Sequence, residues 1–220
     1  MIQAVLFDMD GLMFATEQVY TDCWYLAAAE MGITVTDDLL ASLRGTGVDR
    51  CREIFNGRVP GNHYDDAWAL TLRYVDHFID TQPAPVKPGL MALLDWLKTR
   101  NIPMVLATST ARPRAMRLLR SAGVTDYFSA VTFGTEVPRP KPFPDVFLAA
   151  AASVGAAPEN CVVLEDSHNG LRAAKAAGCT AIVVPDMDPA PPEALGLWDY
   201  RLQSLDQAIP ILEALMDIHK

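Results

Sequence analysis

The sequence lacks the long apolar run that a membrane-spanning helix requires. None of its stretches approaches the roughly 18 consecutive apolar residues of such a helix. The segment Met1–Ala4 carries no basic residue and leads directly into an apolar, strand-like stretch, unlike a secretory signal. We therefore expect a soluble protein of the cytoplasm that does not act at a membrane.

Basic residues are too few for a nucleic-acid partner. The chain has 18 Lys and Arg against 27 Asp and Glu, which gives a net charge of −9. Nucleic-acid backbones are bound by basic surfaces, so this balance argues against such a partner. A small phosphate can still bind an acidic protein where a metal ion or a few local cations reverse the field.

Cysteine is scarce as well, and no C-x-x-C pair occurs. The four cysteines lie far apart in the sequence, at Cys23, Cys51, Cys161 and Cys179. We expect reduced and mostly buried thiols, and neither a disulfide framework nor a cysteine-based metal site.

Apolar residues, in contrast, make up half of the chain, enough for a sizeable core. Short apolar runs alternate with helix-patterned segments, which is typical of a parallel sheet covered by helices on both faces. This pattern predicts an α/β, Rossmann-like core over residues 1–13 and 86–220. The expected strands are Ala4–Phe7, Pro103–Ala107, Ala130–Phe133, Cys161–Leu164, Thr180–Val184 and a short Tyr200–Leu202. The expected helices are Gly89–Thr99, Arg112–Ser121, Asp145–Val154, Gly170–Ala177 and a terminal Ser204–Ile218.

One interval, residues 14–85, interrupts the alternation with helical patterns alone. Its expected helices are Glu17–Met31, Asp37–Leu43, Asp49–Phe55 and Tyr64–Thr81, followed by a stiff, proline-rich connector. An insertion directly after the first strand predicts an all-helical cap domain that closes over a ligand. A helical subdomain without a gating role is the alternative.

Two carboxylates leave the end of the first strand, in Asp8-Met9-Asp10-Gly11. Side chains alternate along an extended chain, so Asp8 and Asp10 lie on the same side. Adjacent carboxylates repel, and a cation or a shared proton relieves the repulsion. In phosphoryl transfer one such Asp can attack phosphorus while the other handles protons. An acidic turn without catalytic function is the alternative reading.

Polar residues also follow the next predicted strands. Thr108 and Ser109 precede a helix, where hydroxyls and backbone N–H groups favour phosphate oxygens or simply cap the helix. Lys141 lies in a loop stiffened by four prolines and could pair with Asp8 and hold a phosphate, or remain a solvated surface residue. Glu165 and Asp166 end the fourth strand and suit Mg²⁺, although Asp166 could also cap the following helix.

In this order, Asp8-Met9-Asp10-Gly11, Thr108, Lys141-Pro142 and Glu165-Asp166-Ser167 resemble the four motifs of the haloacid-dehalogenase-like hydrolase superfamily. The helical insertion resembles its C1-type cap, and the chain is most similar to the β-phosphoglucomutase and sugar-phosphatase branch. The resemblance spans nearly the whole chain and is weakest across the insertion and after Pro185.

The resemblance implies a role for each motif residue. Asp8 would become an aspartyl-phosphate, and Asp10 would act as general acid and base. Thr108 and Lys141 would hold the transferring phosphoryl group. Mg²⁺ would be bound by Asp8, the main-chain carbonyl of Asp10 and Asp166, with Glu165 directly or through water.

The chain also departs from the branch pattern. Ala15 stands where relatives often have Asp, Pro140 precedes the motif lysine where Gly is common, and Tyr20 replaces a histidine typical of the mutase. Residues 14–85 contain no lysine, which excludes a phosphonate-cleaving relative and weakens the mutase interpretation, although an arginine could substitute. Asp10 argues against a true dehalogenase.

We therefore predict a Mg²⁺-dependent phosphatase acting on small phosphorylated metabolites, with a phosphosugar mutase as the first alternative. A phospho-accepting receiver-like signalling module and a catalytically silent binding protein are alternatives of other classes. The candidates for substrate binding are Ser109, Arg44, Thr46 and Glu17. The sequence indicates neither the identity of the substrate nor an oligomeric state.

Overall fold

The computed structural model describes residues 2–44, 46–187 and 196–217 of the chain. Two compact units form: Thr16–Pro83 makes up one, and the residues up to Ala15 and from Ala84 onward make up the other. The insertion was predicted at residues 14–85, and the smaller unit lies inside these bounds. It starts two residues later and stops two residues earlier than predicted.

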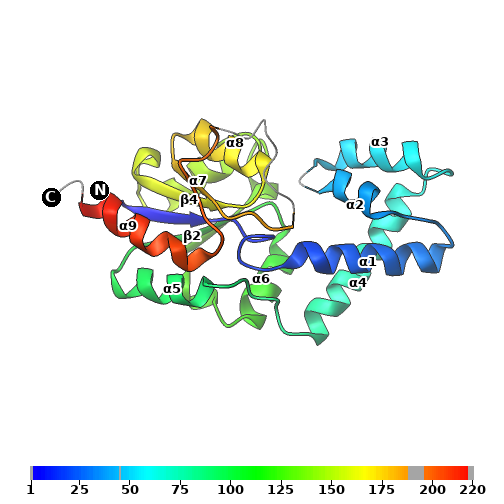
Figure 1. Cartoon of the computed structure of the whole chain (residues 1–220), viewed down its shortest axis with the longest axis horizontal. Helices are drawn as coiled ribbons and strands as arrows, with labels where there is room; N and C mark the ends of the chain where they lie inside the picture. The colour runs from blue at the N-terminus through cyan, green and yellow to red at the C-terminus, as the bar shows by residue number, and fades with distance from the viewer. Residues whose placement is uncertain (1, 45, 188–195, 218–220) are drawn as a thin grey trace. The chain divides into compact units, whose positions relative to one another are not determined.

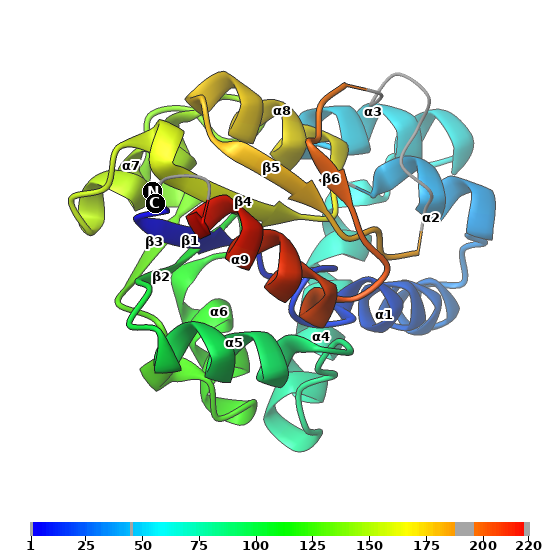
Figure 2. The same ribbon diagram turned by 60° about the vertical axis from the view of Figure 1, so that its left-hand side comes forward.

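The larger unit is built on one sheet of six parallel strands. In spatial order the strands are β3-β2-β1-β4-β5-β6, and every neighbouring pair is parallel. This confirms the predicted α/β class, with β6 added at the edge beyond β5 (Figure 2). The strands are β1 Ala4–Phe7, β2 Met104–Thr108, β3 Ala130–Phe133, β4 Cys161–Glu165, β5 Thr180–Val183 and β6 Tyr200–Arg201.

Helices cover both faces of this sheet, which explains the continuous apolar strands (Figure 1). On one face, α7 and α8 pack over alternate strand residues; for example, Leu6 and Val163 lie in one buried cluster with Phe147 and Leu171. The helices of this unit are α5 Leu90–Thr99, α6 Arg112–Ser121, α7 Asp145–Ser153, α8 His168–Ala177 and α9 Ala208–Asp217. Short 3₁₀ helices span Thr125–Tyr127, Gly134–Glu136, Pro158–Asn160 and Leu205–Gln207.

The smaller unit is all-helical in its described residues and has a core of its own. It comprises α1 Thr16–Met31, α2 Asp37–Leu43, α3 Val48–Arg58 and α4 Tyr64–Thr81. Aromatic rings form the centre of its core: the Trp24 ring lies 5.3 Å from that of Phe55 and 5.6 Å from that of Trp68, between centroids. Such ring pairs stabilise a small core beyond the area that they bury.

The predicted start of the terminal helix is wrong. A 3₁₀ turn occupies Leu205–Gln207 and α9 begins only at Ala208. Pro210 then falls in the first turn, where its missing N–H would have had no helical partner. Ser204 and Gln207 have the spacing of a capping box but do not form one, because Oε1 of Gln207 accepts a hydrogen bond from the N–H of Gln203 at 2.9 Å. The predicted helix end, Ile218, and most of the loop that follows Pro185 lie outside the described residues.

All four cysteines are free and buried, as predicted. Burial raises the pKa of the Cys23 and Cys161 thiols to about 11, so neither is a reactive thiolate near neutral pH. Within residues 2–44, 46–187 and 196–217, no helix has both the length and the apolar character needed to cross a membrane.

Candidate active site

The register of β1 and β4 brings Asp8 and Glu165 together. Phe7 pairs with Leu164, and the backbone N–H of Asp8 donates to the Leu164 carbonyl at 3.0 Å. Asp8 and Glu165 are the next residues along the chain from this pair, and alternation along an extended chain directs their side chains to the same face. Asp8 is 7% exposed and Glu165 is fully buried. Two carboxyl groups in one buried site require a cation or a proton.

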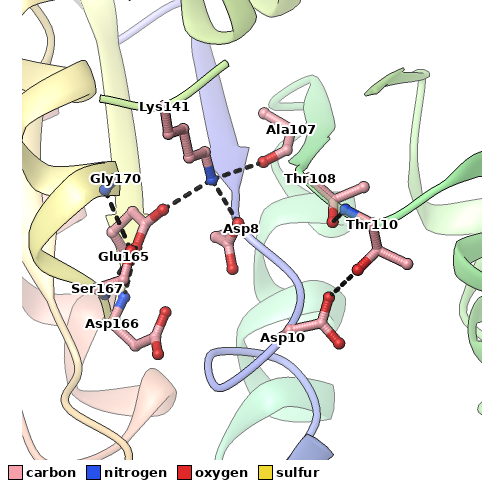
Figure 3. A network of polar contacts seen from close by, with 10 residues as sticks. All are labelled: Asp8, Asp10, Ala107, Thr108, Thr110, Lys141, Glu165, Asp166, Ser167 and Gly170. Carbon is pink, nitrogen blue, oxygen red and sulfur yellow. Dashed lines mark hydrogen bonds and ion pairs between the residues drawn. The ribbon is translucent and has the colours of Figure 1, made fainter. Parts of the chain in front are cut away.

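Lys141 supplies that cation from the loop before α7. Its ammonium group contacts Oδ1 of Asp8 and donates to Oε1 of Glu165 at 2.7 Å and to the Ala107 carbonyl at 3.1 Å (Figure 3). The Phe147 ring lies beside the same ammonium group, with its centroid 4.9 Å away. Every hydrogen of the ammonium group therefore has an acceptor, and its position is fixed.

The electrostatics of this site are dominated by burial. Burial raises the pKa of Asp8 to about 7, and Glu165 and Asp10 add to the rise while Lys141 opposes it. Burial alone would lower the pKa of Lys141, but the two carboxyl groups reverse that effect and hold it above its usual range. Lys141 is therefore protonated at neutral pH, and its charge is what favours an ionised Asp8.

Glu165 is almost fully occupied by hydrogen-bond donors of the protein itself. While Lys141 binds Oε1, the other oxygen accepts from the N–H of Asp166 at 2.9 Å, the N–H of Ser167 at 2.8 Å and the Ser167 hydroxyl at 2.9 Å. A carboxylate offers about four lone-pair positions. Glu165 thus orients Lys141 and shapes the turn into α8, where Ser167 also caps the helix through the N–H of Gly170 at 3.1 Å.

Two glycines make room for the acidic side chains. Gly11 adopts a positive φ of 80°, and a Cβ placed there would overlap the Asp166 carboxylate. A Cβ on Gly170 would overlap the Glu165 carboxylate. Among the described residues, Asp8, Glu165 and Asp166 each offer an oxygen, and the three oxygens lie within 4.8 Å of one another. Oxygen ligands at this spacing suit Mg²⁺.

We expect Gly170→Ala to lower the free energy of unfolding by about 1–3 kcal/mol, the usual cost of overpacking a buried site. The added methyl must displace the Glu165 carboxylate and disturb its contact with Lys141. Urea unfolding monitored by circular dichroism measures the change. Gly57→Ala in α3 is the matched control, because its Cβ would meet no atom within 4 Å and its stability should be unchanged or increased. An unchanged free energy of unfolding for Gly170→Ala would contradict the close packing of Gly170 against the Glu165 carboxylate.

The turn after β2 connects Thr108 with Asp10. Thr108 is fully buried, and its hydroxyl oxygen accepts a hydrogen bond from the N–H of Thr110 at 3.0 Å. The Thr110 hydroxyl in turn donates to Oδ2 of Asp10 at 2.5 Å (Figure 3). The phosphate-binding candidate and the acid–base candidate are therefore linked through one residue, Thr110.

The structure thus brings Asp8, Lys141, Glu165 and Asp166 together, with Asp10 in the turn after β1 and Thr108 at the end of the neighbouring strand β2 (Figure 3). Ser109 is exposed beside them. The other three substrate-binding candidates belong to the helical unit: Glu17 lies in the first turn of α1, Arg44 follows α2, and Thr46 donates weakly to backbone carbonyls nearby. Their part in binding stays a prediction.

Sequence reasoning missed three contributors. It gave Thr110 no role, it named Ser167 only as part of the fourth motif, and it gave Gly170 no packing function. The hydroxyl run Thr108-Ser109-Thr110 was the available signal for Thr110, because alternate residues in an extended segment point to one side.

Comparison with known proteins gives a consistent set of relatives. The model of the haloacid dehalogenase-like hydrolase family matches residues 2–178. A phosphorylated carbohydrates phosphatase of Thermotoga maritima is 29% identical over 181 residues, which cover 82% of this chain and 84% of that protein. The beta-phosphoglucomutase of Bacillus subtilis is 31% identical over 195 residues, covering 86% of this chain and 85% of that protein.

A solved structure shares this fold over most of its length. A mutant of CbbY from Rhodobacter sphaeroides, in complex with xylulose-(1,5)bisphosphate, superposes with a TM-score of 0.78 at 28% sequence identity. The match covers 94% of this chain and 96% of that one. The similarity therefore extends to both units of the chain.

Proposed function

Because this chain belongs to the haloacid dehalogenase-like hydrolases and is similar to phosphatases among them, we propose that it is a Mg²⁺-dependent phosphatase of small phosphorylated sugars. The reaction would pass through an aspartyl-phosphate on Asp8. The observation that carries the proposal is the group formed by the buried Asp8 and Lys141 side chains and the half-buried Asp166 at the carboxyl edge of the sheet. Ligands of open parallel sheets bind at this edge, where the order of the strands reverses.

In the first step an Asp8 carboxylate oxygen forms a bond to phosphorus while the bond from phosphorus to the ester oxygen breaks. Protonated Asp10 gives its proton to that ester oxygen, so the sugar leaves as an alcohol. Lys141 contacts Asp8 from a buried position and reduces the repulsion between the carboxylate and the phosphoryl oxygens. The Thr108 hydroxyl already accepts the Thr110 N–H, which leaves its own hydrogen for a phosphoryl oxygen.

In the second step a water oxygen bonds to phosphorus and the bond from phosphorus to Asp8 breaks. Asp10, now a carboxylate, takes the proton from the attacking water. The products are inorganic phosphate and the free Asp8 carboxylate, and the sum of both steps is hydrolysis of the ester by one water molecule.

The donor set at this edge fits a magnesium ion. The oxygens of Asp8, Glu165 and Asp166 lie close enough to share one ion, and Gly11 leaves room for the Asp166 carboxylate. Because Glu165 is occupied by Lys141 and the α8 turn, we assign ion binding mainly to Asp8 and Asp166, with the Asp10 carbonyl as the resemblance implies. When bound, the metal would offset negative charge on Asp8 and on the phosphoryl oxygens.

The helical unit would act as the cap, with Arg44, Thr46 and Glu17 as candidates for contacting the sugar. Hydrolysis is favoured over mutase chemistry because residues 14–85 contain no lysine to grip a second phosphate. The phosphatase relative of Thermotoga maritima, similar over 82% of this chain, supports a phosphorylated carbohydrate as substrate.

A panel of sugar phosphates tests the proposal, with phosphate release measured in Mg²⁺ and in EDTA. We expect turnover in Mg²⁺ and its loss in EDTA, restored by adding Mg²⁺ back, because Asp8 and Asp166 need a cation to receive an anionic substrate. An isomerisation assay on phosphoglucose runs in parallel. Isomerisation without phosphate release would favour the mutase, and full turnover in EDTA would remove the metal from the proposal.

A further inference from the structure

Thr110 joins two residues to which the proposed mechanism gives different tasks. Its hydroxyl donates to Oδ2 of Asp10 at 2.5 Å, across 100 positions of sequence. Its N–H donates to the Thr108 hydroxyl oxygen at 3.0 Å. Both contacts come from a single residue in the turn after β2, so Thr110 links the Asp10 carboxyl to the Thr108 hydroxyl (Figure 3).

We propose that Thr110 is a positioning residue that holds the Asp10 carboxyl in line with the ester oxygen of a substrate whose phosphoryl group is bound at Thr108. This inference rests on the proposed phosphatase function and adds a residue to it. Thr110 touches neither the phosphoryl group nor the ester oxygen in this assignment. It acts through Asp10 alone.

The chemical reason lies in the direction of proton transfer. Asp10 follows β1 by three residues, and two of its side-chain torsions set where its carboxyl oxygens point. A hydrogen bond at Oδ2 restricts both torsions and so directs Oδ1, the oxygen that would carry the proton to the ester oxygen. General acid catalysis needs the acid within hydrogen-bond reach of the leaving oxygen, and a displacement of about 1 Å can cost up to about 10²-fold in rate.

The test compares Thr110→Val, which removes the hydroxyl at nearly constant shape, with Thr110→Ser, which keeps it. Two esters separate proton delivery from other effects. An alkyl phosphate needs a proton on its leaving oxygen, whereas p-nitrophenolate leaves without one. Thr99→Val at the end of α5 is the matched control, since its hydroxyl bonds only to the Trp96 carbonyl on the surface.

We expect Thr110→Val to lower kcat/KM for the alkyl phosphate about tenfold or more, and for p-nitrophenyl phosphate by less than about threefold. Thr110→Ser and Thr99→Val should behave like the unaltered protein on both esters. In an Asp10→Asn background, Thr110→Val should cause no further loss, because the group that it positions is gone. The proposal would be overturned if Thr110→Val lowered kcat/KM equally for both esters. It would also be overturned if the loss from Thr110→Val added to the loss from Asp10→Asn.

Crystal structures of Thr110→Val and Thr110→Ser separate this inference from the proposed function. The Asp10 carboxyl should leave its position in Thr110→Val and keep it in Thr110→Ser. An unmoved Asp10 in Thr110→Val overturns the positioning role whatever the activity. If the unaltered protein hydrolyses neither ester while Asp10 moves as expected, the phosphatase proposal fails and the contact stands as a structural one.

Discussion

Asp8→Asn is expected to abolish phosphate release, by at least about 10⁴-fold, because an amide cannot attack phosphorus as a carboxylate does. Asparagine keeps the size of the side chain, so the buried position beside Glu165 remains filled. Steady-state phosphate release in Mg²⁺ measures the loss. Intact-mass measurement after acid quenching should show one added phosphoryl group on the unaltered protein during turnover and none on Asp8→Asn.

The same chemical change elsewhere serves as the control. Asp95→Asn in α5 replaces a carboxylate that accepts a hydrogen bond from the Tyr127 hydroxyl on the surface, and it should leave turnover unchanged. Substantial activity of Asp8→Asn, with the asparagine verified by mass after the assay, would end the covalent mechanism. A family member can carry the fold without the chemistry. Phosphate release by the unaltered protein that is lost in Asp8→Asn would therefore distinguish an enzyme from a silent binding protein.

Lys141→Met should produce the largest loss of stability, about 3–5 kcal/mol, because removing one member of a buried ion pair leaves charge without compensation. Only 7% of the Lys141 side chain is exposed, and it is the shared partner of Asp8 and Glu165. Turnover should be lost as well. Urea unfolding in EDTA measures the stability without a contribution from bound metal.

The loss in free energy of unfolding caused by Lys141→Met should grow as the pH rises from 5 to 8. The pKa of Asp8 is already raised to about 7 by burial, and losing Lys141 removes the main influence that lowers it. An acid whose pKa is higher in the folded state than in the unfolded state binds more protons when folded, so stability falls as the pH rises through that interval. Lys141→Met should therefore lose more free energy of unfolding at pH 8 than at pH 5.

Lys175→Met is the matched control for this measurement. Lys175 pairs with Asp199 at 2.9 Å, but about a third of each side chain is exposed. Surface pairs of this kind contribute about 0–1 kcal/mol, and the difference should not depend on pH over this interval. Similar losses for the two lysine variants would mean that Lys141 does not compensate buried carboxylates in solution.

The sheet and the motif order could be predicted from the sequence because both follow from short-range patterns. Continuous apolar runs of four or five residues mark strands buried on both faces, and polar residues directly after them mark one edge. That reasoning placed Asp8, Thr108 and Glu165 at strand ends, where the structure has them. Their convergence could be predicted because the carboxyl ends of neighbouring parallel strands lie at the same edge of a sheet.

What could not be predicted depends on register and on partners distant in sequence. That the Glu165 and Asp8 carboxylates lie close together follows from the alignment of Phe7 with Leu164, which no local pattern encodes. The donors that fill Glu165 include two backbone N–H groups, and every residue but proline carries one. The terminal helix was mispredicted for a related reason, since Gln207 bonded to Gln203 instead of completing a cap.

The contacts of Lys141 and Thr110 also bear on how the protein folds. Lys141 meets Asp8 across 133 positions of the chain, and Thr110 meets Asp10 across 100. Such distant pairs form only after β1 has docked between β2 and β4, so an intermediate without this central strand would lack the proposed substrate and metal sites. Recovery of activity during refolding should therefore follow insertion of β1 between two strands that come much later in the sequence.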